Sequence, residues 1–211
     1  MVDPVNRRQR GFVNSRQALV LLALLFLMPV FVAWFMHLSA EHGWRPGGTT
    51  NKGTLVQPPR PLTLPEGLLD ATGAPLSRNF LGGKWTLIYI GDAACGEACR
   101  QTLYYMRQVR LAQGENLRRV QRLFLATGAS PESGLQEVLV EYPDMAVARL
   151  SPEQAAMIAP VFSIEGNPMQ GAGNVYLVDP LGNLMMYYGP DADPRGMIQD
   201  LQRLLKYSHT G

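Results

Sequence analysis

The first strong pattern along the chain is an apolar run from Ala18 to Leu38, ALVLLALLFLMPVFVAWFMHL, which holds no Lys, Arg, Asp or Glu. A bilayer core of about 30 Å needs roughly 20 apolar residues in a helix, and backbone groups in lipid must be paired within the segment. The run therefore predicts one transmembrane helix over residues 18–38. A cleaved signal peptide is the alternative, but its apolar core would span only about 7–15 residues, and Ser39-Ala40 is a weak cleavage signal.

The charges that flank this run predict its orientation. Arg7, Arg8, Arg10 and Arg16 precede or begin the segment, against a single acid, Asp3. The positive-inside rule predicts a cytoplasmic N-terminal segment, residues 1–17, and export of everything after the span. For a bacterial chain this predicts a single-pass inner-membrane protein with a periplasmic C-terminal domain, in an oxidising compartment.

After the apolar run, the pattern divides the chain into a linker, a folded domain and a short tail. Residues 39–61 are rich in glycine and proline, and Pro58, Pro59 and Pro61 disfavour a regular helix or a central strand there. This composition predicts a linker over 39–61. We expect the folded domain over 62–207 and a tail over 208–211.

The exported domain alternates between strand-like and helix-like patterns. Runs of β-branched and aromatic residues predict strands over 85–90, 120–127, 145–150, 174–179 and 183–188. Apolar spacing and Ser-Pro or Asp-Pro caps predict helices over 96–112, 130–141 and 151–162 and after Asp193. The last two strands form a hairpin, since Asp179-Pro-Leu-Gly182 suits a type I turn. The order predicts an α/β fold that resembles thioredoxin: a mixed sheet with flanking helices, preceded by the transmembrane helix.

Composition and charge exclude several classes of protein. The 211 residues carry 19 Lys and Arg and 17 Asp and Glu, and the basic excess lies in the first 40 residues. The main body therefore lacks the basic footprint of a nucleic-acid-binding protein. The two cysteines are too few for a disulfide-dense scaffold or a four-Cys zinc site.

Those two cysteines, Cys95 and Cys99, are the main candidates for chemistry. They follow the predicted strand over 85–90 and fall where the next helix begins, so their spacing of four puts them on one helical face. Helical geometry separates their Cα atoms by about 6 Å, within the range that a disulfide accepts. A helix N-terminus also stabilises a thiolate, which is both a nucleophile and a soft metal ligand. Arg100 adds positive charge nearby, while Asp92 and Glu97 subtract some.

From spacing alone, three interpretations of the pair remain open. The pair can act in redox exchange or metal binding, it can be a static disulfide, or the two thiols can be incidental. A static disulfide here would add little to the stability of the fold, because closing so short a loop removes little entropy from the unfolded chain. Within a redox interpretation, we expect Cys95 to be the more exposed thiol that attacks a partner disulfide, and Cys99 to resolve the mixed disulfide.

At this point the chain resembles a known family. Cys95-Gly-Glu-Ala-Cys99 after a strand, the later segment Val175–Gly182 followed by Tyr187-Tyr188-Gly189, and the N-terminal apolar run resemble the Sco/SenC family. Its members are membrane-anchored, thioredoxin-like, copper-handling assembly factors for cytochrome c oxidase. The resemblance spans about residues 62–207. It implies that the partners are a cytochrome c oxidase subunit, through its copper-site cysteines, or a copper chaperone.

The sequence departs from that family at the metal ligands. The family has a histidine as its third copper ligand shortly before the hairpin, whereas the matching stretch here is Met169–Asn174, and no histidine occurs from Gly43 to Ser208. The family's two-Cys, one-His copper site is therefore not carried over. Met169 is a weak candidate for a thioether ligand of Cu(I), and local packing is the favoured interpretation of that residue.

Three functional hypotheses follow. The leading one is thiol-disulfide exchange by Cys95 and Cys99 during assembly of a copper site, which requires no cofactor. The second is a non-enzymatic carrier that holds Cu(I) between Cys95 and Cys99 alone. The third is an assembly scaffold without redox activity. A peroxidase is disfavoured, because no cysteine lies in a Thr/Pro-rich loop.

The orientation can be tested with reporter fusions. A reporter fused after residue 60 should be active if it functions only when exported, because the arginines before residue 18 keep the N-terminus in the cytoplasm. The same fusion with a reporter that functions only in the cytoplasm should be silent. Activity of the cytoplasmic reporter would contradict both the orientation and the oxidising compartment.

Overall fold

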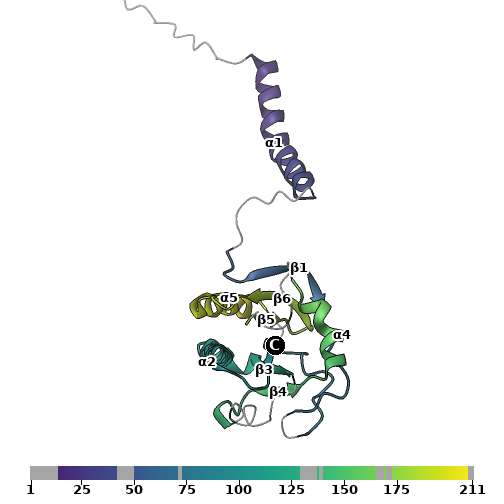
Figure 1. Ribbon diagram of the computed structural model, residues 1–211. Helices are drawn as coiled ribbons and strands as arrows, with labels where there is room; N and C mark the ends of the chain where they lie inside the picture. The colour runs from purple at the N-terminus through teal and green to yellow at the C-terminus, as the bar shows by residue number, and fades with distance from the viewer. Residues whose placement is uncertain are drawn as a thin grey trace, which may run out of the picture. The chain divides into compact units, whose positions relative to one another are not determined.

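A computed structural model of the chain describes residues 14–41, 50–70, 73–128, 137, 140–164, 169 and 173–208 (Figure 1). The chain divides into two compact units, Met1–Thr50 and Asn51–Gly211. In the first unit, the described residues 14–41 contain one helix. The second contains the sheet and the helices that pack on it.

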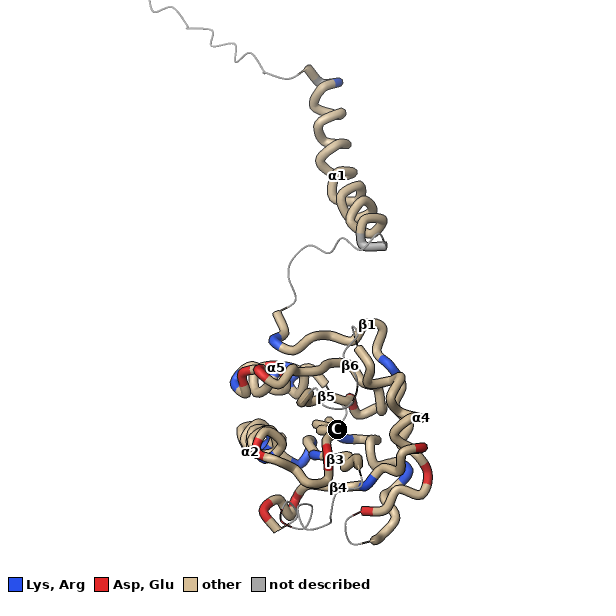
Figure 2. Tube along the Cα trace, viewed as in Figure 1, with Lys and Arg blue, Asp and Glu red and all other residues tan. Residues whose placement is uncertain are grey.

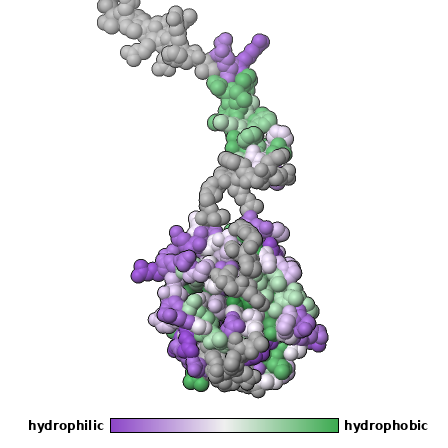
Figure 3. Space-filling view, in the orientation of Figure 1, coloured by the Kyte–Doolittle hydropathy of each residue, from purple (hydrophilic) through white to green (hydrophobic). Residues whose placement is uncertain are grey.

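Helix α1, Ser15–Glu41, contains the predicted span and extends a few residues beyond it at both ends. Its segment Arg16–Ser39 is long and apolar enough to cross a membrane, with a mean hydropathy of 2.7 over its most apolar 18 residues, none of which is buried. Apart from Arg16 at its start, the helix carries no Lys, Arg, Asp or Glu until its last residue (Figure 2), and apolar side chains cover most of its surface (Figure 3). Exposed leucine, valine and phenylalanine on every face are typical of a helix that has lipid around it.

The second unit is built on a six-stranded mixed sheet in the order β1-β6-β5-β2-β3-β4. The strands are β1 (Thr54–Pro61), β2 (Trp85–Asp92), β3 (Val120–Thr127), β4 (Ala146–Arg149), β5 (Val175–Val178) and β6 (Asn183–Tyr188). Strands β2, β3 and β4 run parallel, whereas β5 pairs antiparallel with β2 and the β5–β6 hairpin continues antiparallel to β1. The terminal hairpin therefore makes the sheet mixed, as predicted.

Helices cover both faces of this sheet, as Figure 1 shows. Helices α2 (Glu97–Leu111) and α5 (Pro194–Tyr207) contact each other on one face, and α4 (Pro152–Phe162) covers the other. The pleat of β2 divides the core accordingly, since Leu87 and Tyr89 pack with α2 and α5 while Ile88 and Ile90 pack with α4. A short 3-10 helix, η1 (Gly114–Arg119), connects α2 to β3.

The prediction of a linker through residue 61 is wrong at its C-terminal end. Thr54–Pro61 form β1, which pairs with β6 at the edge of the sheet, and the register shifts between Leu55 and Arg60. Proline lacks an N–H group and is tolerated on an edge strand or at a bulge, where no ladder hydrogen bond is lost. The prolines exclude a central strand but are compatible with the edge strand β1. The folded domain therefore begins before residue 62.

Two polar side chains fasten the ends of β1 to the rest of the domain. Near its start, the buried carboxylate of Asp200 in α5 accepts hydrogen bonds from the backbone N–H groups of Lys52 (2.7 Å) and Gly53 (2.9 Å) and from the hydroxyl of Tyr188 (3.3 Å). At its end, Arg60 donates to three carbonyls at the C-terminus of α4, which have no partner within the helix. Burial, and then the Asp200 charge, raise the pKa of Tyr188 well above its usual value.

The other predicted elements fall close to their observed positions. The strands after Gly83 and the helices now labelled α2, α4 and α5 shift by a few residues at most, and Ser151 forms the expected capping box with Gln154. The helix predicted over 130–141 falls mostly outside the described residues. Only residues 137, 140 and 141 of this range are described. The same holds for the N-terminal segment before residue 14, for residues 42–49 of the predicted linker and for the tail after Ser208.

Replacing Asp200 with Ala should lower the free energy of unfolding by about 2 kcal/mol, because two backbone N–H groups and a buried hydroxyl lose their acceptor. Urea denaturation of the full chain in a non-ionic detergent measures this change. Asp191→Ala is the matched control, since Asp191 is an exposed acid just before the same helix, and it should stay within about 0.5 kcal/mol of the wild type. Equal destabilisation by both variants would contradict the role given to Asp200.

Candidate redox site

The candidate site lies where β2 ends and α2 begins. Strand β2 pairs with β3 along its whole length and with β5 from Thr86 to Tyr89, so its C-terminal end is held by β3. A tight turn follows, in which the Asp92 carboxylate accepts from the N–H of Ala94 (2.7 Å) and the Asp92 carbonyl accepts from the N–H of Cys95 (3.1 Å). Cys95 has a positive φ of 41°, a conformation that costs free energy in a residue other than glycine and is common at functional sites. The turn thus directs Cys95 back toward the helix that follows.

Cys95 and Cys99 form a disulfide across the first turn of α2, with their Cα atoms 5.1 Å apart. The sequence placed the two residues at a helix start and at bridging distance, and the structure brings them together there. Gly96 occupies the N-cap position, and it provides no side-chain hydrogen bond to the helix. The N-terminus of α2 therefore has no side-chain cap from Gly96 and lies next to Cys95, a position that favours negative charge on a sulfur.

Both cysteines are buried in the core between the sheet, α2 and α5. Cys95 is 1% exposed and Cys99 is 7% exposed, so the prediction that Cys95 is the more exposed of the two is wrong. The reason is the turn before the helix: it folds Cys95 inward, whereas Cys99 lies on the first turn of α2. Exposure therefore gives Cys95 no advantage as the residue that a partner reaches first.

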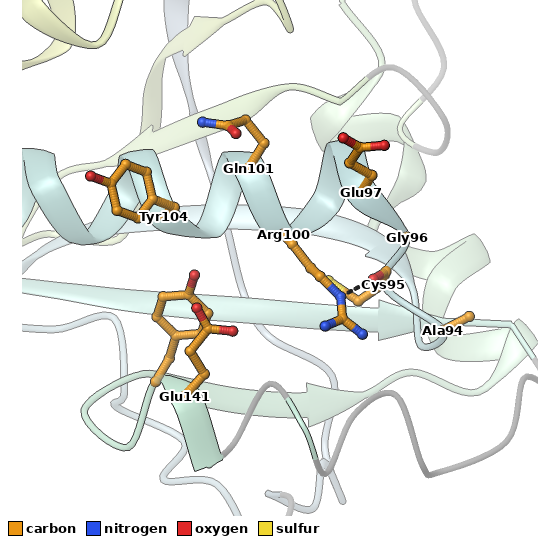
Figure 4. A pocket seen from close by; sticks show the side chains of 9 residues that line it. Ala94, Cys95, Gly96, Glu97, Arg100, Gln101, Tyr104 and Glu141 are labelled. Carbon is orange, nitrogen blue, oxygen red and sulfur yellow. Dashed lines mark hydrogen bonds between the residues drawn. The ribbon is translucent and has the colours of Figure 1, made fainter.

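A pocket of about 500 Å³ opens beside the disulfide. Cys95, Glu97, Arg100 and Tyr104 from the start of α2 line it, together with Glu141 from the segment before β4 (Figure 4). Polar and apolar groups contribute about equally to the lining, which comes from two segments far apart in the sequence. A segment of a partner protein that enters this pocket would lie next to Cys95, which is itself almost fully buried.

Arg100 and Tyr142 set the electrostatic character of this pocket. The Nε of Arg100 donates to the carbonyl of Cys95 (3.2 Å), as the dashed line in Figure 4 shows, and its Nη2 forms an ion pair with Glu137. Burial, assisted by Glu141, raises the pKa of Tyr142 to about 12, so this phenol stays protonated at neutral pH. The positive charge of Arg100 is thus held next to the cysteines and is partly balanced by an acid.

The structure separates Met169 from the cysteine pair. Met169 is buried in the core cluster on the α4 face of the sheet, whereas Cys95 and Cys99 belong to the cluster on the α2 face. Local packing is therefore the interpretation that the structure supports for this methionine. Within the part of the chain that the structure describes, no three His, Cys, Asp or Glu side chains group closely enough to hold a metal ion.

Sequence reasoning missed the residues that form the walls of the pocket. Gln101 and Tyr104 line it because they lie about one turn and two turns beyond Glu97 on the same helical face, and this spacing could have been noticed. Glu141 and Tyr142 carried no signal in the sequence. They reach the site only because the chain returns to the sheet edge at β4, more than 40 residues after Cys95.

The family model for transmembrane-like, thioredoxin-like C-terminal domains matches residues 85–208, which include the whole cysteine site. The chain belongs to this family. Its predicted fold class, a thioredoxin-like mixed sheet with flanking helices and an N-terminal apolar helix, is confirmed.

Relatives and solved structures extend this assignment. A protein from Stutzerimonas stutzeri, named as a proposed copper-binding protein, is 28% identical over 159 residues, or 70% of this chain and 77% of that protein. The structure of ScoI from Bradyrhizobium japonicum with copper bound matches with a TM-score of 0.54 at 21% identity, covering 67% of this chain and 98% of that one. The apo Sco protein of Thermus thermophilus matches with a TM-score of 0.58 at 21% identity, covering 75% and 99%. The predicted resemblance to the Sco/SenC proteins is thus confirmed in the fold.

Proposed function

We propose that this protein is a membrane-anchored, periplasmic thiol-disulfide exchange protein that acts on the copper-site cysteines of a cytochrome c oxidase subunit or of a copper chaperone. The observation that carries the proposal is the Cys95–Cys99 disulfide at the start of α2, beside an open pocket. A disulfide that closes so short a loop contributes little to stability. Reversible chemistry accounts for its position better than a structural role does.

The exchange reaction needs only the two cysteines. In the reduced protein, one thiolate attacks a sulfur of the partner's disulfide, which forms a mixed disulfide and releases the partner's other sulfur as a thiolate that takes up a proton. The second cysteine of the pair then attacks its neighbour's sulfur, restores the Cys95–Cys99 disulfide and releases the partner's second thiol. Two electrons pass from the pair to the partner, and the reverse sequence oxidises a partner dithiol.

The surroundings support this role for the pair. The N-terminus of α2 and the guanidinium of Arg100 both favour a thiolate over a thiol at this position. The pocket offers a partner segment hydrogen-bonding groups from Arg100, Tyr104 and Glu141. The apolar helix α1 would keep the domain close to partners in the same membrane. A solved thiol-disulfide oxidoreductase domain from Bacteroides vulgatus shares the fold, with a TM-score of 0.51 at 18% identity.

The exchange can be tested with the full chain in detergent and a synthetic peptide whose two cysteines, spaced as Cys-x-x-x-Cys, are joined in a disulfide. The reduced wild type should convert the peptide to its dithiol, and Cys95→Ser or Cys99→Ser should stop at a mixed disulfide that is visible on a non-reducing gel. The single-serine variant that traps more peptide still carries the attacking cysteine, so comparing the two variants identifies which cysteine attacks. The double serine variant is the control. Equal peptide reduction by the control and the wild type, or no reduction by either, would overturn the proposal.

A second candidate function is that of a Cu(I) carrier, and the donor set of the reduced pair favours it. Two thiolates at the start of one helix are soft ligands that suit Cu(I), whereas Cu(II) prefers nitrogen and oxygen donors in a tetragonal arrangement. The sequence between Gly43 and Ser208 holds no histidine that could complete such a site. In this role copper is the cargo of the protein, and the pair must be reduced to hold it.

Titration of the reduced chain with Cu(I) in competition with a chelator should therefore show one bound ion, and Cu(II) should not be retained after dialysis. Cys99→Ser should abolish Cu(I) retention, while Met169→Ala, a change on the other face of the sheet, should leave it within about twofold. Stable Cu(II) binding by the wild type would mean that further ligands exist and would contradict this donor set. Failure of both the peptide and the Cu(I) experiments would leave the scaffold hypothesis.

A further inference from the structure

A second pocket, of about 490 Å³, lies at the opposite end of β2 from the disulfide. Lys84 lines it immediately before β2 begins, whereas Cys95 follows the strand's other end. The eight residues of β2 put roughly 25 Å between these two ends. The pocket is therefore separate from the candidate redox site, and nothing in the proposed exchange chemistry uses it.

Four cationic side chains and one carboxylate line this pocket. Lys84 precedes β2, Arg110 comes from α2, Arg118 from η1 and Arg122 from β3, and the carboxylate is that of Asp144. The cations come from four different segments that the fold brings to one place. With a single acid among them, the pocket carries an excess of positive charge, which is unfavourable for the isolated protein and favourable for an anionic ligand.

Each oxygen of the one carboxylate is paired with one of these cations. Arg110 contacts one oxygen of Asp144 at 2.6 Å, and Arg122 forms an ion pair with the other. Lys84 and Arg118 are exposed, and neither forms an ion pair with a described residue. Two exposed cations in the lining are thus available to an anion from outside.

Arg122 provides a second and independent observation. Its side chain is fully buried, yet its Nε and Nη1 atoms have no hydrogen-bond partner among the described residues. A buried guanidinium with too few acceptors is costly, and its charge acts strongly on its surroundings because burial reduces screening by water. Burial lowers the pKa of Arg122, and the charges of Arg110 and Arg107 lower it further, while Asp144 opposes both effects.

We infer that this pocket is a binding site for a phosphate group, held by Lys84, Arg118 and Arg110 over the buried charge of Arg122. A phosphate dianion matches the excess of positive charge, and its three or more oxygens can accept from several of these donors at once. The phosphate can belong to a free phosphorylated molecule or to the headgroup of an anionic phospholipid, since both present the same chemistry.

Calorimetric titration of the full chain with inorganic phosphate, in a non-ionic detergent at low ionic strength, tests this inference. The double variant Lys84→Gln, Arg118→Gln should bind phosphate at least about tenfold more weakly, because it loses two charge-assisted contacts. A matched control, Arg78→Gln with Lys206→Gln, removes the same charge from exposed positions outside the pocket and should bind as the wild type does. Equal weakening by both double variants, or no phosphate binding by the wild type, would overturn the inference.

Nanodiscs distinguish the two sources of the phosphate group. If phospholipid headgroups occupy the site, phosphatidylglycerol discs should weaken the apparent affinity of the wild type for inorganic phosphate relative to phosphatidylcholine discs, and the control variant should follow the wild type. If affinity is the same in both discs, the site serves free phosphorylated molecules. Either result requires that the wild type binds phosphate more tightly than the pocket variant.

Discussion

The pairing of β2 on both of its edges is the interaction on which the rest of this domain depends. Every residue of the strand is matched with β3, and Thr86 to Tyr89 are also matched with β5, so neither end of β2 can move without breaking ladder hydrogen bonds. The side chains of the strand fill the cores on both faces of the sheet. The turn after Asp92 therefore starts from a fixed point. The sheet, and not the loop that carries Cys95, fixes the position of the disulfide.

This architecture also explains how one small domain can present two chemically different ends. Strands β2 and β3 are parallel, so both begin at one end of the sheet and both finish at the other. The finishing end carries the cysteines, with the amino terminus of α2 beside them. The starting end collects the cations of η1, β3 and the residue before β2 around Asp144. The same strands connect the two groups of side chains, but no residue belongs to both groups.

The elements with strong local patterns could be predicted from the sequence, and those defined by long-range pairing could not. The buried strands at Trp85 and Val120 and the capped helix after Ser151 are specified by nearby residues, and they appear close to where the patterns place them. β1 was missed because its prolines carry the signal of a linker, and only pairing with β6 and the Asp200 hydrogen bonds make it a strand. In the site, the spacing of the cysteines was sufficient to predict their proximity. Their burial was not predictable, because it depends on the turn at Cys95 and on the packing of α5.

The way in which the chain joins the domain at Asn51 has a mechanical consequence. Lys52 and Gly53 are hydrogen-bonded to Asp200 in α5, and the strand that follows is paired with β6 at the sheet edge. A pull on the chain ahead of Asn51 would be carried first by these bonds and by α5. In the sheet order, β6 and β5 lie between β1 and β2, so the load would be shared among two further strands before it reached β2. Along the sheet, the attachment point is thus separated by two strands from the strand that carries the cysteine turn, and the shorter path for the load is through α5, which packs in the same core as both cysteines.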